Sequence, residues 1–176
     1  MNVLIISCSL NPDSRSRVLA LDAQRLLHEA HVETRFVDLR DHPIALCDGE
    51  ACDPRASALA DDIRKADAIL LAVPIYNYDV NAAAKNLVEQ TGKAWEGKIV
   101  GFLCAAGGHG SYMSVMSLAN SLMLDFRCVI VPRFVYATGD AYDADGSIAS
   151  EKIRGRVDQL CRETARLARA LATAGA

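Results

Sequence analysis

The chain has 176 residues, a formal net charge of −3 and 51% hydrophobic residues. This length and composition fit a single domain, 1–176, with a substantial core, and the nearly balanced charge argues against nucleic acid or an acidic membrane as the main partner. No uninterrupted apolar segment approaches the roughly 20 residues that a membrane-spanning helix needs. The N-terminal MNVLIISCS has no basic residue and too short an apolar run for a signal peptide, so we expect a cytoplasmic protein.

Apolar runs alternate with helical patterns along the chain. The runs are expected to form strands, and they lie at 2–9, 31–39, 67–76, 98–106 and 128–136. Most are nearly continuous, which is typical of parallel strands covered by helices on both faces. Helical spacing is found from Leu19 to Ala30, from Leu59 to Ala66 and, most extensively, over 150–172. The alternation predicts an open, doubly wound α/β domain.

The six cysteines are dispersed, and three of them lie inside apolar runs. This usage is typical of buried free thiols in a cytosolic protein. The segment CDGEAC has a C-x4-C spacing, but no second pair or histidine cluster accompanies it. Two free thiols on a loop are therefore a simpler interpretation than a zinc site, and we expect no metal.

Ligands of open parallel sheets bind outside the carboxyl ends of the strands. Four segments follow strands in this way: SLNPDSRS, ALCDGEACDP, PIYNYDVNAAAKN and AAGGHGSYM. The first opens a helix and matches neither of the familiar glycine-rich phosphate motifs. Its Ser9, Ser14 and Ser16 can donate hydrogen bonds to a phosphate together with backbone N–H groups. The alternative is a helix cap at Ser14 or Ser16 beside a turn, but one cap explains only one serine.

The segment after the third strand carries aromatic and amide side chains. Pro74 lacks an N–H group and predicts the end of the hydrogen-bonded ladder. Tyr76 and Asn77 bring a ring and an amide to the edge of the sheet. Asp79 or Asn81 is then expected to cap the next helix.

The segment after the fourth strand is rich in glycine. Gly107, Gly108 and Gly110 permit either a close approach of backbone to a ligand or positive φ angles in a tight turn. A flat heterocycle fits between this segment and the one after the third strand. The alternative is two ordinary surface turns.

Taken together, CSLNPDSRS, PIYNYDVNAAAKN and AAGGHGSYM resemble, in order and spacing, the loops of the NADPH-dependent FMN reductase family of flavodoxin-like proteins. The resemblance implies a flavodoxin-like five-stranded parallel sheet of order 2-1-3-4-5 with helices on both faces. It also implies FMN as cofactor and NADPH or NADH as co-substrate. The residues implied to bind the cofactor are Ser9, Ser14 and Ser16 at the phosphate, with Asn11 in the same loop, Pro74, Ile75, Tyr76 and Asn77 at the isoalloxazine, and Gly107, Gly108 and His109 near its pyrimidine end.

The activity implied by this resemblance is that of an FMN-dependent NAD(P)H oxidoreductase. Hydride would pass from the nicotinamide to FMN, and electrons would then pass to a quinone, a flavin or a similar small acceptor, with no side chain acting as acid or base. The family resemblance also implies a homodimer or homotetramer. Asn11 stands where the family usually has arginine, and Arg15 or Arg17 is a candidate substitute, so the choice between NADPH and NADH stays open.

Two other functions fit the same fold class. The first is a flavodoxin-like electron carrier without its own NAD(P)H activity, but such carriers resemble a T-x-T-G-x-T loop and are strongly acidic. The second is a receiver-like signalling module, which would place an aspartate at the end of the third strand. The sequence VPIYN at that end argues against a receiver.

Overall fold

The computed structural model describes residues 1–49 and 53–174. Its strands and helices follow one another as predicted, with short additions. The elements in chain order are β1 (Asn2–Ser7), α1 (Arg15–Glu29), β2 (Glu33–Asp38), α2 (Pro54–Lys65), β3 (Ala68–Tyr76), β4 (Asp79–Val80), α3 (Ala82–Thr91), β5 (Ile99–Ala105), α4 (Met116–Phe126), β6 (Val129–Ile130), β7 (Val135–Ala137) and α5 (Glu151–Ala174). Short 3-10 helices occupy Gly92–Trp95, His109–Val115 and Gly139–Ala141.

The strands form one sheet in which β3 is central and lies between β1 and β5. Its order is β2-β1-β3-β5-β6, with β7 also pairing with β5 and β4 added to the end of β3. The long strands are parallel, and β4 alone is antiparallel. Counted over the five predicted strands, this is the order 2-1-3-4-5. The neighbours β2 and β3 lie on opposite sides of β1, which creates a switch point where a ligand crevice is expected.

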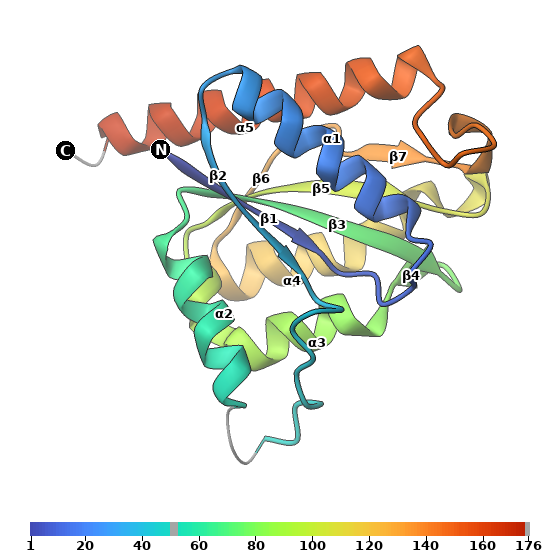
Figure 1. Ribbon diagram of the computed structural model, residues 1–176. Coiled ribbons are helices and arrows are strands. Elements are labelled where there is room, and N and C mark those ends of the chain that lie inside the picture. The colour runs from blue at the N-terminus through green and yellow to red at the C-terminus, as the bar shows by residue number, and fades with distance from the viewer. Residues whose placement is uncertain (50–52, 175–176) are drawn as a thin grey trace.

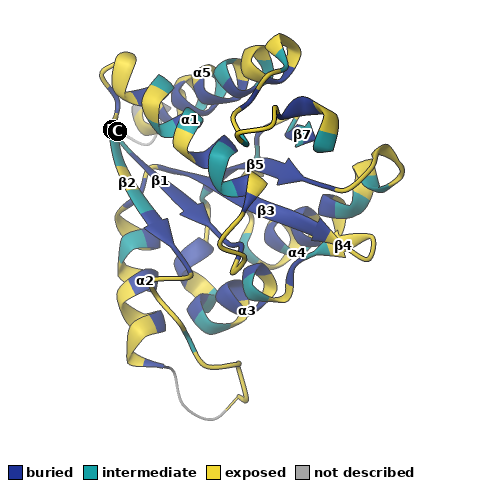
Figure 2. Cartoon of the chain, turned by 45° about the vertical axis from the view of Figure 1, so that its right-hand side comes forward, coloured by how far each residue is buried: buried dark blue, intermediate teal, exposed yellow. Residues whose placement is uncertain are grey.

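Helices cover both faces of the sheet (Figure 1). Successive side chains of a strand point to opposite faces, so Leu4 and Ile6 pack toward α2, α3 and α4, while Val3 and Ile5 pack toward α1 and α5. Figure 2 shows the central strands buried along their length and the outer helix surfaces exposed. Burial on both faces explains why the strands read as continuous apolar runs.

The fifth predicted strand, 128–136, is broken in the structure. Its two pieces, β6 and β7, both pair with β5, and Arg133 between them has a φ of 60°, which extended backbone does not adopt. The prediction that the hydrogen-bonded ladder ends at Pro74 is confirmed for the pairing of β3 with β5 but not for β3 as a whole. Pairing of β3 with β5 ends at Pro74, but β3 itself continues to Tyr76 and forms a hairpin with β4.

Helix α5 packs across the sheet against α1 and β5. Its apolar stripe includes Val157, Leu160 and Ala165, all buried. It approaches the sheet closely at Gly101, where an added Cβ atom would lie 2.8 Å from Leu70 Cδ2 and 3.1 Å from Leu160 Cδ1. Among the described helices, α5 included, none is both long enough and apolar enough to cross a membrane.

Candidate functional site

The loop between β1 and α1 buries its serines at the start of the helix. Ser14 is the N-cap residue, and its Oγ accepts a hydrogen bond from the Arg17 N–H at 3.1 Å. The Oγ atoms of Ser14 and Ser16 lie 3.1 Å apart, and Ser9 Oγ accepts from the Asn11 N–H at 3.2 Å. All three serines are buried. Capping thus accounts for Ser14, while Ser9 and Ser16 place further hydroxyls beside the positive end of the helix dipole.

The β3–β4 hairpin forms a second wall. Its two central residues, Asn77 and Tyr78, have φ angles of 51° and 63°, the pattern of a type I′ turn. Asparagine tolerates this conformation, whereas it strains a tyrosine. Tyr76 and Tyr78 are both exposed at this turn. Asn81 occupies the N-cap position of α3, but its side chain makes no capping bond and instead donates from Nδ2 to the Cys8 carbonyl at 2.7 Å.

The glycine-rich segment after β5 forms a third wall. Gly107, Gly108 and Gly110 all have ordinary negative or extended φ angles, so the positive-φ alternative is wrong. A Cβ atom added at Gly107 or Gly108 would meet no protein atom within 4 Å, although both residues line a cavity. The Tyr136 hydroxyl fixes the segment by donating to the Gly108 carbonyl at 2.6 Å. The missing side chains therefore leave room for a ligand rather than for packing.

The β7–α5 loop closes the site, and sequence reasoning missed it. This loop is not among the four segments that the sequence singles out, but Tyr142 and residues 143–146 line the same cavity. Tyr142 donates from its hydroxyl to the Arg15 carbonyl at 3.1 Å and lies under the Arg15 guanidinium, 5.6 Å from ring centroid to Cζ. Burial raises the pKa of Tyr142, so its hydroxyl stays protonated. Ligands bind outside the carboxyl ends of parallel strands, and this loop follows the carboxyl end of β7. Its position could therefore have predicted its part in the site.

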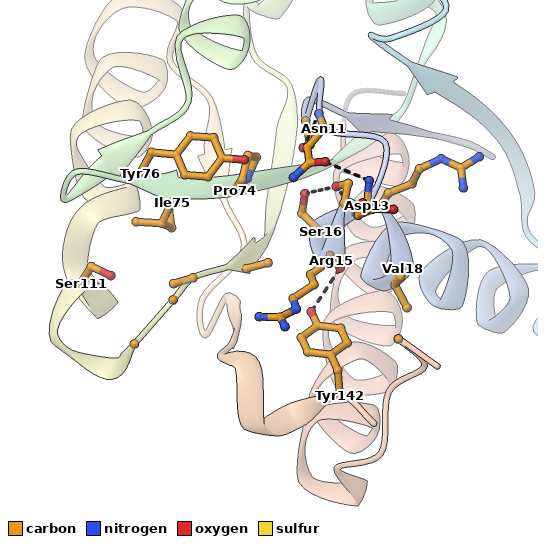
Figure 3. A pocket seen from close by; sticks show the side chains of 18 of the residues that line it. Asn11, Asp13, Arg15, Ser16, Val18, Pro74, Ile75, Tyr76, Ser111 and Tyr142 are labelled. Carbon is orange, nitrogen blue, oxygen red and sulfur yellow. Dashed lines mark hydrogen bonds between the residues drawn. The ribbon is translucent and has the colours of Figure 1, made fainter. Parts of the chain in front are cut away.

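These four segments enclose a cavity of about 1180 Å³ (Figure 3). Of the eleven predicted cofactor residues, ten line it: Ser9, Asn11, Ser14, Ser16, Pro74, Ile75, Tyr76, Asn77, Gly107 and Gly108. His109 does not line it; its exposed ring lies 3.9 Å from the Asp140 carboxylate. The pKa of Asp140 is lowered, mainly by a hydrogen bond from Thr138, with a smaller contribution from His109.

The segment after β2 lies away from the cavity. Asn86 holds it, accepting from the Cys47 N–H at 2.9 Å and donating to the Ala45 carbonyl at 2.9 Å. Neighbouring Lys85 pairs with Glu89 at 3.1 Å. The paired lysine and asparagine of PIYNYDVNAAAKN therefore support the scaffold rather than the site.

The cysteines are mostly shielded thiols. Cys8, Cys104, Cys128 and Cys161 are buried, and burial raises the pKa of each, to about 11 at Cys128 and about 12 at Cys161. Protonated buried thiols are poor nucleophiles and poor ligands. Cys47 is exposed, and Cys52 of the C-x4-C pair lies outside the described residues. Within 1–49 and 53–174, no cluster of three potential metal-binding side chains occurs.

Comparison with known proteins identifies the family. The family model described as NADPH-dependent FMN reductase matches residues 1–143. The chain belongs to the NADPH-dependent FMN reductase family. It is accordingly an enzyme, an NAD(P)H oxidoreductase that uses FMN and has a flavodoxin-like fold. The resemblance found in the three loops is thus confirmed.

Individual relatives agree with this assignment. The chain is 27% identical over 135 residues to a probable NADPH:quinone oxidoreductase 1 of Oryza sativa subsp. japonica, covering 70% of this chain and 68% of the relative. The solved structure of the flavoenzyme NAD(P)H:(acceptor) oxidoreductase FerB from Paracoccus denitrificans superimposes with a TM-score of 0.72, 25% identity and coverage of 94% and 97%. An archaeal flavodoxin shares the fold alone, with a TM-score of 0.67, 12% identity and coverage of 96% and 99%.

The residues of the cavity fit FMN. Ser14 and Ser16 at the N-terminus of α1, and Ser9 after β1, have buried hydroxyls of the kind that bind a phosphate. The positions of Gly107 and Gly108 are open on the cavity side, so backbone amides can approach a flat ring. The cavity volume of about 1180 Å³ is at the upper end of, or above, the roughly 300–1,000 Å³ of ordinary small-molecule pockets, which is sufficient for a ligand the size of FMN.

Proposed function

We propose that this enzyme passes electrons from NADPH or NADH, through FMN held in the cavity, to a small quinone-type acceptor. The proposal rests on one observation. The β1–α1 loop with its serines (the serine loop, 9–16), the β3–β4 hairpin and the glycine-rich segment after β5 (the glycine segment, 107–110) all line one cavity (Figure 3). The acceptor class is supported by the quinone oxidoreductase among the relatives and by the acceptor oxidoreductase among the solved structures. Free flavin is a second acceptor that the same cavity would admit.

Each wall has a distinct task in this proposal. Ser9, Asn11, Ser14 and Ser16 bind the phosphate of FMN, because their hydroxyl and amide groups surround the start of α1. Pro74, Ile75, Tyr76 and Asn77 lie along one side of the isoalloxazine, and Gly107 and Gly108 offer backbone groups to the other. His109 has no task here, because it points its exposed ring toward Asp140.

The chemistry of transfer belongs to the cofactor. Bound FMN supplies an acceptor for hydride and a donor of electrons. The chain binds and orients the reacting rings, and it excludes water from their contact. The exposed aromatic rings of Tyr76 and Tyr78 flank the open side of the cavity, where a flat co-substrate or acceptor would stack.

We also propose a single domain over 1–176 that acts as a homodimer or homotetramer in the cytoplasm. The family model stops at residue 143, but α5 packs into the same core as α1. Large apolar side chains stay exposed near the site and on α4, among them Met113, Met116 and Leu124. Such exposed apolar groups support self-association.

A double substitution tests the phosphate assignment. Ser14→Ala combined with Ser16→Ala should weaken FMN binding by about 10-fold or more, since each hydrogen bond to a charged group contributes about 1.5–3 kcal/mol. Riboflavin, which lacks the phosphate, should bind as it does to the unmodified protein. Ser57→Ala combined with Ser121→Ala, which removes one exposed and one half-buried hydroxyl away from the cavity, is the matched control. Equal weakening of FMN and riboflavin would reject the phosphate role, as would an effect of similar size in the control.

A further inference from the structure

The cavity contains two cationic side chains within the described part of the chain, and both come from the first turn of α1. These are Arg15 and Arg17. Three carboxylates, those of Asp13, Asp143 and Asp145, line the same cavity. A phosphoryl group entering this cavity meets negative charge, so its binding depends on a cation that is free to pair with it.

Arg17 already forms an ion pair within the protein. Its Nε donates to Asp38 Oδ2 at 2.7 Å, and Asp38 is buried at the end of β2. The guanidinium also lies over the Phe36 ring, 6.0 Å from the centroid. Turning Arg17 toward a ligand would leave a buried carboxylate without its cation, which is strongly unfavourable.

Arg15 differs from Arg17 in this respect. Among the described residues, no carboxylate pairs with its guanidinium and no acceptor takes a hydrogen bond from it. Neutral groups hold it in place: the Tyr142 ring lies 5.6 Å away, and a Cβ atom added at Gly139 would come within 3.1 Å of Nη1. Figure 3 shows the guanidinium beside the Tyr142 side chain, projecting away from α1. These contacts therefore orient the Arg15 guanidinium and leave its N–H groups available to a ligand.

Asn11 offers no comparable charge. Its side chain is neutral, and its Oδ1 accepts from the Asp13 N–H at 2.9 Å, which fixes the turn of the loop. The nearest following cation that lines the cavity is Arg15, four residues on, at the first position of α1.

We propose that Arg15 is the residue that binds a phosphoryl group of a ligand in this cavity, and that Arg17 is not. The inference rests on the proposed function of the cavity. The guanidinium has a planar fork of donors that matches phosphate oxygens, and the N-terminus of α1 adds to its attraction. Two ligands carry such a group, FMN at its 5′ position and NADPH at its 2′ position, and the test separates them.

The test compares Arg15→Gln, Arg15→Lys and the matched control Arg17→Gln. Dissociation constants of FMN and riboflavin are measured by quenching of flavin fluorescence with cofactor-free protein, and KM is measured for NADPH and NADH with FMN in excess. If the group is the FMN phosphate, Arg15→Gln weakens FMN about 10- to 100-fold and leaves riboflavin unchanged. If it is the 2′-phosphate, KM rises by a similar factor for NADPH and not for NADH.

The variants make the assignment falsifiable. Arg15→Lys keeps the charge and should retain a large part of the selectivity that Arg15→Gln loses. Arg17→Gln should lower the stability of the fold, because the buried Asp38 loses its cation, but should leave both the FMN-to-riboflavin ratio and the NADPH-to-NADH ratio unchanged. The inference is overturned if Arg15→Gln alters neither ratio, or if Arg17→Gln alters one of them as strongly. Failure of the unmodified chain to bind FMN at all would reject the proposed function and the inference with it.

Discussion

The hydrogen bond from Asn81 to Cys8 links two walls of the cavity and makes a sharp prediction. Asn81 lies at the start of α3, 73 residues from Cys8, and its Nδ2 donates to the Cys8 carbonyl at 2.7 Å in a buried setting. Its backbone N–H donates to the Pro74 carbonyl at 3.2 Å. This residue therefore fixes the hairpin wall against the serine loop. The isosteric change Asn81→Asp replaces the donor with an acceptor.

The cost of this change follows from the geometry. The Cys8 carbonyl loses its donor, which costs about 1–3 kcal/mol. The introduced carboxylate is also buried without a cation, and the N–H groups at the start of α3 offset only part of that cost, so the total penalty should exceed the first amount and reach at most about 3–5 kcal/mol, a large share of the about 5–15 kcal/mol that stabilises a domain. Asn81→Ala removes the donor without adding charge and should cost only the first amount. Both changes should also weaken FMN binding, because Ser9 follows Cys8 directly.

Acid should relieve the penalty of Asn81→Asp alone. Burial raises the pKa of the introduced carboxyl group in the folded state above its ordinary value of about 3.9. The penalty is therefore complete above the raised pKa and shrinks as the pH falls through it, because the protonated group can donate to Cys8. Urea unfolding of both variants and the unmodified protein, from about pH 8 to about pH 5, measures this difference. A loss below about 1 kcal/mol that does not vary with pH would show that the hydrogen bond from Asn81 to Cys8 contributes little to the fold.

Three further outcomes follow from other parts of the fold. Gly108→Ala should leave the thermal unfolding midpoint unchanged, since an added Cβ atom meets no protein atom within 4 Å, yet weaken FMN binding in a fluorescence titration; unchanged binding would contradict the assigned ring contact. Gly101→Ala should destabilise the chain by about 1–3 kcal/mol in urea, because its Cβ atom would lie 2.8 Å from Leu70 Cδ2, and a neutral effect would show that this contact relaxes freely. Hydrogen bonds, first of all from the Arg55 side chain, hold the pKa of Asp53 far below its ordinary value. The stability that Asp53 contributes is therefore present above the ordinary carboxyl pKa and is lost as the pH falls, so Asp53→Asn should flatten the dependence of the unfolding midpoint on acid, and parallel curves would contradict this.

Much of the fold was predictable because buried strands have a recognisable amino-acid pattern. Strands such as β1 and β3 are covered on both faces, so their apolar runs are continuous and bounded by polar residues. The break in the last strand was not predictable, since it depends on the backbone at Arg133, and arginine carries no signal for a positive φ. The β4 strand is only two residues long and arises from turn geometry at Asn77 and Tyr78, which apolar periodicity does not report.

The site was predictable where its residues follow a strand directly. Ten of the eleven predicted cofactor residues line the cavity, because each belongs to a segment at the carboxyl end of a central strand. Tyr142 was missed because it joins the site through a long loop and a contact with Arg15 across 127 positions of sequence. The sequence also could not predict that Arg17 forms an ion pair and Arg15 does not, since this depends on the distance from Arg17 to Asp38.

The central claim is that one cavity binds FMN so that a nicotinamide cofactor can reduce it. The most direct measurement is an anaerobic titration of the FMN-loaded protein with NADPH and, separately, NADH, followed by the blue absorbance of the flavin. We expect the protein to bind FMN, at least one nicotinamide cofactor to bleach it, and a quinone to restore the colour. Binding of FMN without bleaching by either cofactor would contradict the enzyme assignment and favour an electron carrier.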